Sequence, residues 1–91
     1  MANSLFAIIV ENPEVPNSSD FIGEDTPIFA KNLEESREII DGHIFDIIES
    51  QNPLGHVLKY SVVPWFGNDF GDPVLIKEKK GYSYKEYVPK N

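Results

Sequence analysis

The longest periodic pattern in the chain predicts one amphipathic helix over residues 33–51. On a wheel of about 100° per residue, one arc of this segment is apolar and the opposite arc is acidic. Asn32 precedes it as a favourable N-cap with Glu35 three residues later, and Pro53 prevents its continuation. The apolar arc holds Leu33, Ile40, Ile44, Ile47 and Ile48, with Ile39 and His43 at its border. The opposite face holds Glu34, Glu35, Glu38, Asp41, Asp46 and Glu49.

Two residues of this segment break the pattern. Gly42 lies in the middle of the predicted helix, where glycine costs about 1 kcal/mol relative to alanine. It is expected either to allow close packing on a sheet edge or to divide the helix in two. Phe45 lies among the acidic residues, one turn from both Asp41 and Glu49.

Apolar and β-branched runs predict strands on both sides of the helix. Residues 5–10 form a continuous apolar run, which indicates a strand covered on at least one face. Residues 27–31 are a second, short candidate that leads directly into the helix. Residues 56–66 alternate in the manner of a strand, and Pro64 near their end predicts an edge position or a bend.

The C-terminal residues predict a β-hairpin. The segments 74–79 and 82–88 flank Lys80-Gly81, and glycine suits the second position of a tight turn. The predicted register pairs Lys77 with Tyr84, Lys79 with Tyr82, and Val74 with Tyr87.

These elements predict a single α+β domain that spans residues 1–91. One amphipathic helix packs on a mostly antiparallel sheet of about four to five strands, in the order β-(β)-α-β-β-β. Residues 11–27 are predicted to form a long acidic loop, because they contain three prolines, Gly23 and five acids. Phe21 and Ile22 are expected to pin this loop to the core.

Composition narrows the class of protein. The chain has 91 residues, is 41% apolar and contains no cysteine, which excludes disulfides and thiolate metal sites. No apolar run approaches the roughly 18 residues of a membrane span. Because no basic residue precedes Lys31, the sequence predicts no secretory signal, and we expect a cytoplasmic protein without a membrane partner.

Charge is distributed unevenly along the chain. Residues 1–72 carry 13 acidic and 3 basic side chains, whereas residues 73–91 carry 5 lysines and 2 glutamates. The first part therefore has a formal charge of −10 and the second a charge of +3. Such asymmetry bears on the choice of partner and on association rates.

The main hypothesis is a non-enzymatic protein-binding module, an inhibitor or accessory factor of phage or other viral origin. Its acidic helix face and loop would occupy a basic surface of a partner protein, such as a surface that binds nucleic acid. An exposed aromatic ring would supply affinity. The alternative is a solvated helix face with Phe45 tucked under a neighbouring segment. The predicted contact residues are Glu34, Glu38, Asp41, Phe45 and Glu49 on the helix and Asp20, Glu24 and Asp25 in the loop.

Two further hypotheses concern the hairpin. Its edge strand would pair with a second copy in a structural or self-assembling subunit. Alternatively, basic residues interleaved with aromatic ones would bind single-stranded nucleic acid, although the acidic body makes this partner a poor match. Lysines on a hairpin also protect an edge strand from unwanted pairing. The residues of the nucleic-acid hypothesis are Lys77, Lys79, Tyr82, Tyr84 and Lys85.

The sequence contains no motif for catalysis, a cofactor or a metal. A nucleophile elbow, a P-loop, a dinucleotide fingerprint and His–carboxylate metal spacing are all missing. The loop 68–72 has oxygen ligands around Gly71 but not the spacing of a calcium loop. We therefore expect no enzymatic activity, and we expect His43 to lie at the boundary of the core.

Overall fold

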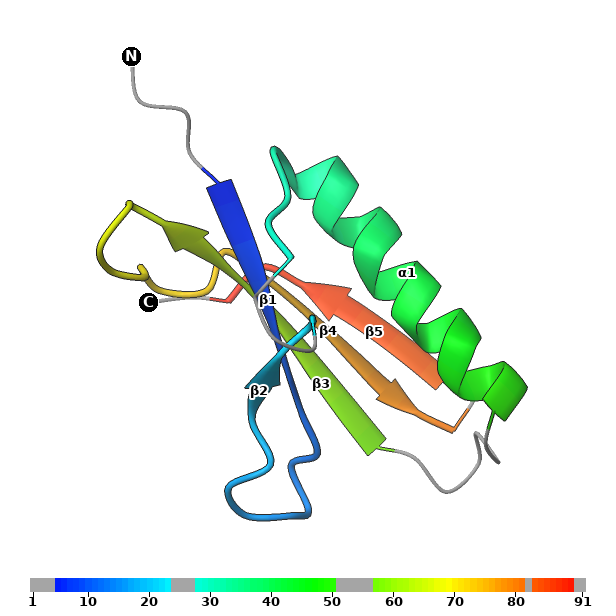
Figure 1. The fold of residues 1–91 in the computed structure, drawn as a ribbon. Helices are drawn as coiled ribbons and strands as arrows, with labels where there is room; N and C mark the ends of the chain where they lie inside the picture. Colours follow the sequence, from blue (N-terminus) through cyan, green and yellow to red (C-terminus); the bar gives the residue numbers. More distant parts are fainter. Residues whose placement is uncertain (1–4, 24–27, 51–56, 82, 90–91) are drawn as a thin grey trace.

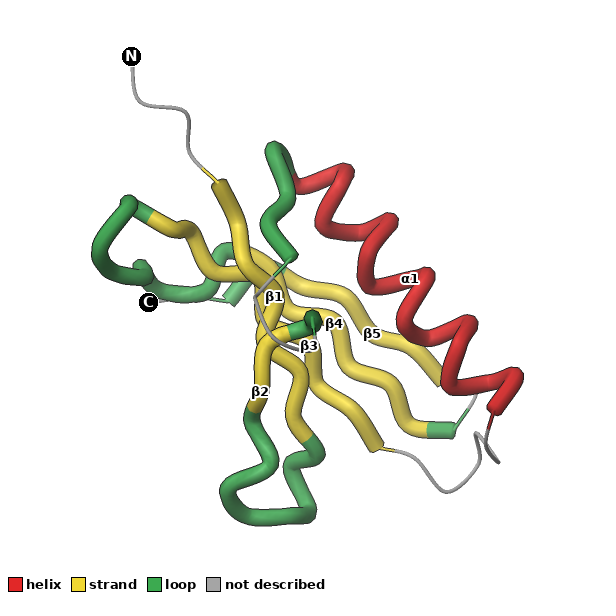
Figure 2. Tube along the Cα trace, in the orientation of Figure 1, coloured by secondary structure: helices red, strands yellow, loops and turns green. Residues whose placement is uncertain are grey.

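The computed structural model describes residues 5–23, 28–50, 57–81 and 83–89, with the side chains of all of these except residues 47–50. One helix lies on one face of a five-stranded antiparallel sheet (Figures 1 and 2). The sheet has the spatial order β2-β1-β3-β4-β5. In sequence the elements are β1 (Leu5–Glu11), β2 (Asp20–Phe21), α1 (Leu33–Ser50), β3 (Val57–Trp65), β4 (Leu75–Lys80) and β5 (Ser83–Tyr87). The predicted α+β class is confirmed.

The start of α1 is fixed by the predicted capping residues. The side-chain Oδ1 of Asn32 accepts a hydrogen bond from the backbone N–H of Glu35 at 2.8 Å. The carboxylate of Glu35 in turn accepts the backbone N–H of Lys31 at 3.4 Å. The first bond satisfies a backbone donor that the helix N-terminus would otherwise leave unpaired, and the second holds the residue before the cap against the first turn.

Both expectations for Gly42 are wrong. The helix runs without a break from Leu33 to Ser50, so Gly42 does not divide it. A Cβ placed on Gly42 would meet no heavy atom within 4 Å, so no close approach requires a glycine there.

The main core lies between α1 and the sheet. Ile40 and Ile44 of the helix are buried against the sheet residues that point the same way. The other buried members of this core are Ile8, Ile22, Tyr60, Val62 and Leu75.

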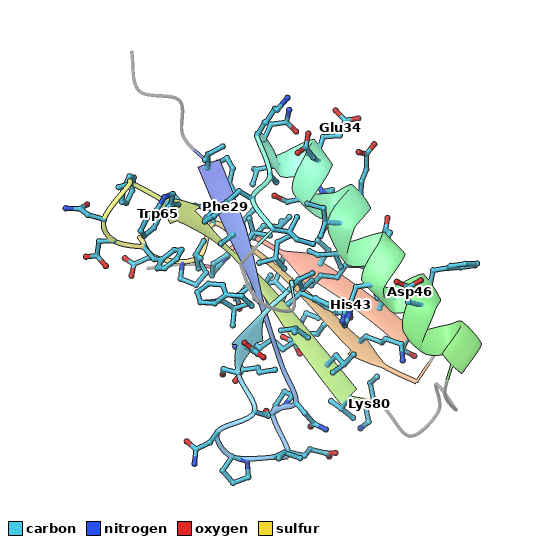
Figure 3. The ribbon with its side chains drawn as sticks, viewed as in Figure 1. Phe29, Glu34, His43, Asp46, Trp65 and Lys80 are labelled. Atoms are coloured by element: carbon cyan, nitrogen blue, oxygen red, sulfur yellow. The ribbon has the colours of Figure 1, made fainter. Side chains whose placement is uncertain are left out.

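The opposite face of the sheet is covered at one end by aromatic rings. Ala7 and Val63 point to this face and are buried. Ring centroids are 5.2 Å apart for Phe21 and Phe70, 4.6 Å for Phe70 and Trp65, and 6.1 Å for Trp65 and Phe29. Figure 3 shows Trp65 and Phe29 close together at the end of β3. The sheet is therefore covered on both faces at this end.

The second strand is not where the sequence predicted it. Residues 28–31 contribute only one bridge, from Ala30 to Phe6, and residue 27 lies outside the described residues. The strand beside β1 is β2, inside the segment predicted as a loop. The expectation that this loop is pinned to the core is confirmed, because Ile22 is buried and donates its N–H to the carbonyl of Ile8 at 3.0 Å.

The predicted hairpin register is wrong by two residues. The structure pairs Lys79 with Tyr84, Lys77 with Glu86, and Ile76 with Tyr87. Gly81 has φ of 60° and is the first connecting residue, not the second, so β4 extends to Lys80. Because side chains alternate with a period of two, a slip of two leaves every side chain on its predicted face.

Pro64 lies in the inner strand β3, at a position where the N–H that proline lacks is not needed for a hydrogen bond to a neighbouring strand. Phe6 pairs with Pro64, but the N–H and C=O of Phe6 both bond to Ala30 on the other side. The pairing of β3 with β4 has already ended at Val62. Pro64 therefore occupies a local edge, where its carbonyl accepts the N–H of Gly71 at 2.9 Å.

Candidate functional site

Four of the predicted contact residues form one stripe along the outside of α1. Glu34, Glu38, Asp41 and Phe45 follow the spacing i, i+4, i+7 and i+11, which places them on one side of a helix. We call these four residues the acidic stripe. All four are exposed, and Phe45 is 58% exposed. A ring tucked under a neighbouring segment does not fit this exposure.

The carboxylates of the acidic stripe differ in their surroundings. The Asp41 carboxylate accepts a hydrogen bond from Lys77 Nζ of β4 at 2.8 Å. Within the described part of the chain, Glu34 and Glu38 make no ion pair and no side-chain hydrogen bond. Figure 3 shows Glu34 at the outer side of the first turn. Among the described side chains, Glu34 and Glu38 therefore place two carboxylates without an ion pair on the first two turns of the helix.

The β4–β5 hairpin flanks the acidic stripe. Besides the bond from Lys77 to Asp41, Arg37 Nε pairs with Glu86 Oε2 of β5 at 3.2 Å. These two contacts tie one side of α1 to the hairpin. Both involve an exposed carboxylate or guanidinium, so they orient the helix surface more than they stabilise the fold.

The structure does not bring the loop residue Asp20 into the acidic stripe. Asp20 lies on β2, at the sheet edge opposite β5, whereas the stripe leans toward β4 and β5. Figure 1 shows the β1–β2 connection extending away from α1. Asp20 instead accepts the backbone N–H of Phe21 at 2.8 Å. Glu24, Asp25 and the side chain of Glu49 lie outside the described residues.

The lysines and tyrosines of the hairpin do not share one surface. Alternation along the strands turns Lys77 and Tyr84 toward the helix side and Lys85 toward the opposite side. Lys77 is bonded to Asp41 and lies 5.7 Å from the ring centroid of Tyr84, and Lys79 is fully buried. Tyr82 lies outside the described residues. Because successive residues of a strand point to opposite faces, the sequence alone already implied that these side chains are divided between the two faces.

His43 forms a hydrogen bond with the core residue Tyr60. Its Nδ1 lies 2.7 Å from the Tyr60 hydroxyl oxygen, and the two rings meet edge to face. Burial lowers the pKa of His43, while the charge of Asp46 raises it. Burial, and then the charge of Tyr84, raises the pKa of Tyr60. The expectation that His43 lies at the core boundary is confirmed, because its side chain is half-buried (Figure 3).

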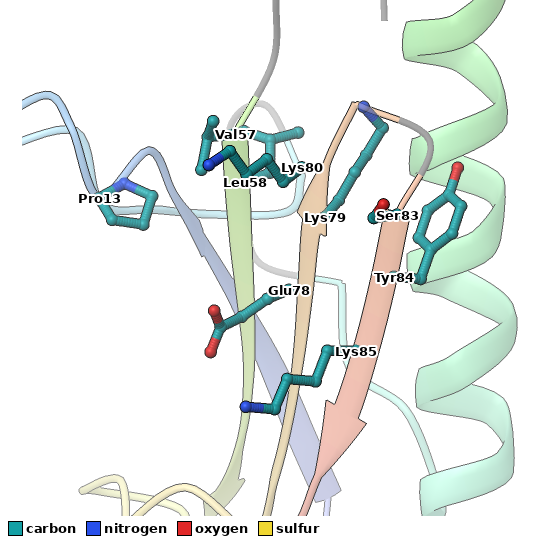
Figure 4. A pocket seen from close by; sticks show the side chains of 9 residues that line it. All are labelled: Pro13, Val57, Leu58, Glu78, Lys79, Lys80, Ser83, Tyr84 and Lys85. Carbon is teal, nitrogen blue, oxygen red and sulfur yellow. The ribbon is translucent and has the colours of Figure 1, made fainter. Parts of the chain in front are cut away.

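The described residues offer little to hold a metal or a small molecule. No three of their His, Asp and Glu side chains gather closely enough to bind a metal ion. One open pocket of about 180 Å³ lies at the ends of β3, β4 and β5 (Figure 4). Another, of about 190 Å³, is lined by Ile9, Ser19, Asp20 and Phe21.

The chain matches no protein-family model, no curated protein and no solved structure. Among the described residues, no helix is both long and apolar enough to cross a membrane. Function is therefore inferred from the geometry of the chain itself.

Proposed function

We propose that this protein is a non-catalytic protein-binding module, an inhibitor or accessory factor whose acidic stripe occupies a basic surface of a partner. The observation that supports this most strongly is the exposure of Phe45, 58%, at the end of a line of exposed carboxylates. A large ring left in water on folding gains free energy when a partner buries it.

The acidic stripe has the spacing of a helix that binds in a groove. Such helices present their contact residues at i, i+4, i+7 and i+11, as Glu34, Glu38, Asp41 and Phe45 do. Carboxylates steer association with a basic surface and set its orientation, whereas a buried ring supplies most of the affinity. The two kinds of residue have complementary roles along one line.

The hairpin contacts hold the acidic stripe in a defined place. Lys77 fixes the Asp41 carboxylate, and the Arg37–Glu86 pair fixes the next turn of the helix toward its N-terminus. Asp41 therefore loses less conformational entropy on binding than a carboxylate without a partner. Glu34 and Glu38 remain to meet the cations of the partner.

The proposed partner surface is one that also binds nucleic acid. The three carboxylates of the stripe follow one another at intervals of about 4.5–6 Å along the helix axis. A nucleic-acid strand likewise presents a line of closely spaced negative charges to its protein. Competition between this protein and an oligonucleotide for the captured partner tests this step.

The test is capture of a partner on immobilised protein, followed by titration of the identified partner against matched variants. Phe45→Ala is expected to weaken binding about tenfold or more. Glu34→Lys with Glu38→Lys is expected to slow association and to reduce its dependence on salt.

The matched control is Glu14→Lys with Asp72→Lys. It changes the net charge by the same amount at two exposed carboxylates outside the stripe. This control should bind like the unaltered protein. The proposal is wrong if the control loses as much affinity as the stripe variants, or if neither stripe variant loses any.

A further inference from the structure

The outer edge of β1 is largely covered. The N–H and C=O of Phe6 bond to Ala30, both at 2.8 Å, and the carbonyl of Ile8 accepts the N–H of Ile22. Val10 pairs with Asp20 of β2. β2 itself has only two residues, and the Asp20 carboxylate takes the N–H of Phe21. This side of the sheet presents no free strand edge among the described residues.

Among the residues that the structure describes, no strand pairs with the other edge of the sheet, β5. Lys80 and Ser83 flank the two connecting residues of the hairpin, so their pair exchanges backbone hydrogen bonds. Alternation along the ladder then turns the N–H and C=O of Tyr84 and Glu86 away from β4. No backbone bond of the described chain reaches them, and residues 83–86 are exposed. β5 therefore offers two N–H groups and two carbonyls to another strand.

Two lysines lie on one face of the sheet near this edge, Lys85 on β5 itself and Lys80 at the end of the neighbouring β4. Figure 4 shows Lys80 and Lys85 beside the 180 Å³ pocket, on the opposite side of the sheet from Tyr84. Within the described part of the chain, neither lysine forms an ion pair with a carboxylate. Lys85 Nζ lies 5.1 Å from the ring centroid of Tyr87.

The carboxylates nearest this edge are already engaged. The Tyr87 hydroxyl donates to Glu78 Oε2 at 2.5 Å, a hydrogen bond that raises the pKa of Tyr87. Glu86, on the helix side, pairs with Arg37. Among the described residues, the edge therefore presents unpaired backbone groups, with Lys85 beside them and Lys80 one strand further in, and neither lysine pairs with a carboxylate.

We propose that β5 takes an extended, acidic segment of a partner protein as an additional strand. Its backbone bonds to Tyr84 and Glu86, and carboxylates at alternate positions reach Lys80 and Lys85. This site is separate from the acidic stripe and takes a ligand of opposite charge. It therefore goes beyond the proposed function and stands or falls independently of it.

Charge argues against a second copy of the chain as the occupant. An antiparallel pair of β5 strands that joins Tyr84 of one copy to Glu86 of the other places the two Lys85 side chains opposite each other. Like charges directly opposite destabilise a strand pair.

The experiment measures amide hydrogen exchange by NMR with a short capped peptide of alternating glutamate and threonine. A peptide of alternating lysine and threonine is the control. At an acidic-peptide concentration about ten times its dissociation constant, the amides of Tyr84 and Glu86 are expected to exchange about tenfold more slowly. The Lys85 amide already bonds to β4 and should change little. The lysine peptide should slow none of them.

Two variants separate backbone pairing from side-chain effects. Tyr84→Pro removes an outward N–H without removing a bond to β4, and Tyr84→Thr is its matched control with the N–H intact. Only the proline variant should lose the acidic peptide, once circular dichroism shows that both variants fold. If the proline variant does not fold, the double variant Lys80→Glu with Lys85→Glu tests the proposal instead. This variant should bind the lysine peptide in preference to the acidic peptide.

Three results overturn the proposal. The first is no slowing of Tyr84 and Glu86 at millimolar acidic peptide. The second is equal binding by folded Tyr84→Pro and Tyr84→Thr, or an unchanged peptide preference in the double-glutamate variant. The third is that the protein forms a dimer without any peptide and that Tyr84→Pro abolishes this dimer. The β5 edge would then bind a second copy of the chain.

Discussion

The imidazole of His43 on α1 and the hydroxyl of Tyr60 on β3 are joined by a 2.7 Å hydrogen bond at the boundary between helix and sheet. Tyr60 is fully buried and His43 is half-buried. Burial lowers the pKa of His43 and raises that of Tyr60, so both groups are favoured in their neutral forms. The bond therefore connects the two layers of the fold with no net charge.

This pair predicts a loss of stability in mild acid. The pKa of His43 lies below about 6.5 in the folded protein, so the unfolded chain binds more protons as the pH falls below that value. The His43 contribution is complete above pH ~6.5 and declines as the pH falls from there toward the lowered pKa. Urea unfolding of the protein and of His43→Gln, measured on both sides of this pH, tests the prediction. His43→Gln should flatten the dependence, and an unchanged slope would contradict it.

Gly42→Ala is expected to stabilise the protein by about 1 kcal/mol. Gly42 lies inside a continuous helix, and a Cβ there would meet no heavy atom within 4 Å. Alanine therefore gains helix propensity without a steric cost. The free energy of unfolding from urea denaturation measures the change. Destabilisation would show that the helix exterior at this position is covered.

Gly71→Ala is expected to destabilise the protein by about 1–3 kcal/mol. A Cβ on Gly71 would lie 2.8 Å from Pro64 Cγ and 2.9 Å from a ring carbon of Phe66. The exposed Phe66 ring can turn aside, but the Pro64 ring is fixed to the backbone of β3, so the loop must shift to accept a methyl group. The same urea experiment compares this variant with Gly42→Ala, and a stability equal to that of the unaltered protein would contradict the close packing.

The helix was predictable from the sequence because its determinants are local. The 3.6-residue pattern and the Asn32–Glu35 cap depend on residues within one or two turns of each other. β2 has only two residues and no periodicity, and it becomes a strand only because it pairs with β1. No rule based on sequence neighbours detects such an element.

The hairpin register shows a different limit. Glycine at position 81 suits either place in a two-residue connection, and both choices put each side chain on the same face. The hydrophobic pattern therefore cannot distinguish the two possible registers of the hairpin. The structure selects the register in which Lys80 pairs with Ser83.

The acidic stripe was predictable in part. The helical phase alone places Phe45 in line with Asp41 and Glu38. The contacts of Asp41 with Lys77 and of Arg37 with Glu86 depend on where the hairpin lies against the helix. The periodicity of the helix alone does not predict that position.

The most direct test of the central claim is the affinity of the captured partner for Phe45→Ser, compared with Phe66→Ser as a matched control. Both rings are largely exposed, at 58% and 65%. Phe45→Ser is expected to weaken binding about tenfold or more while its free energy of unfolding changes by less than about 0.5 kcal/mol. Phe66→Ser is expected to bind with the affinity of the unaltered protein. An unchanged affinity in folded Phe45→Ser would contradict the proposal that the acidic stripe is the binding surface.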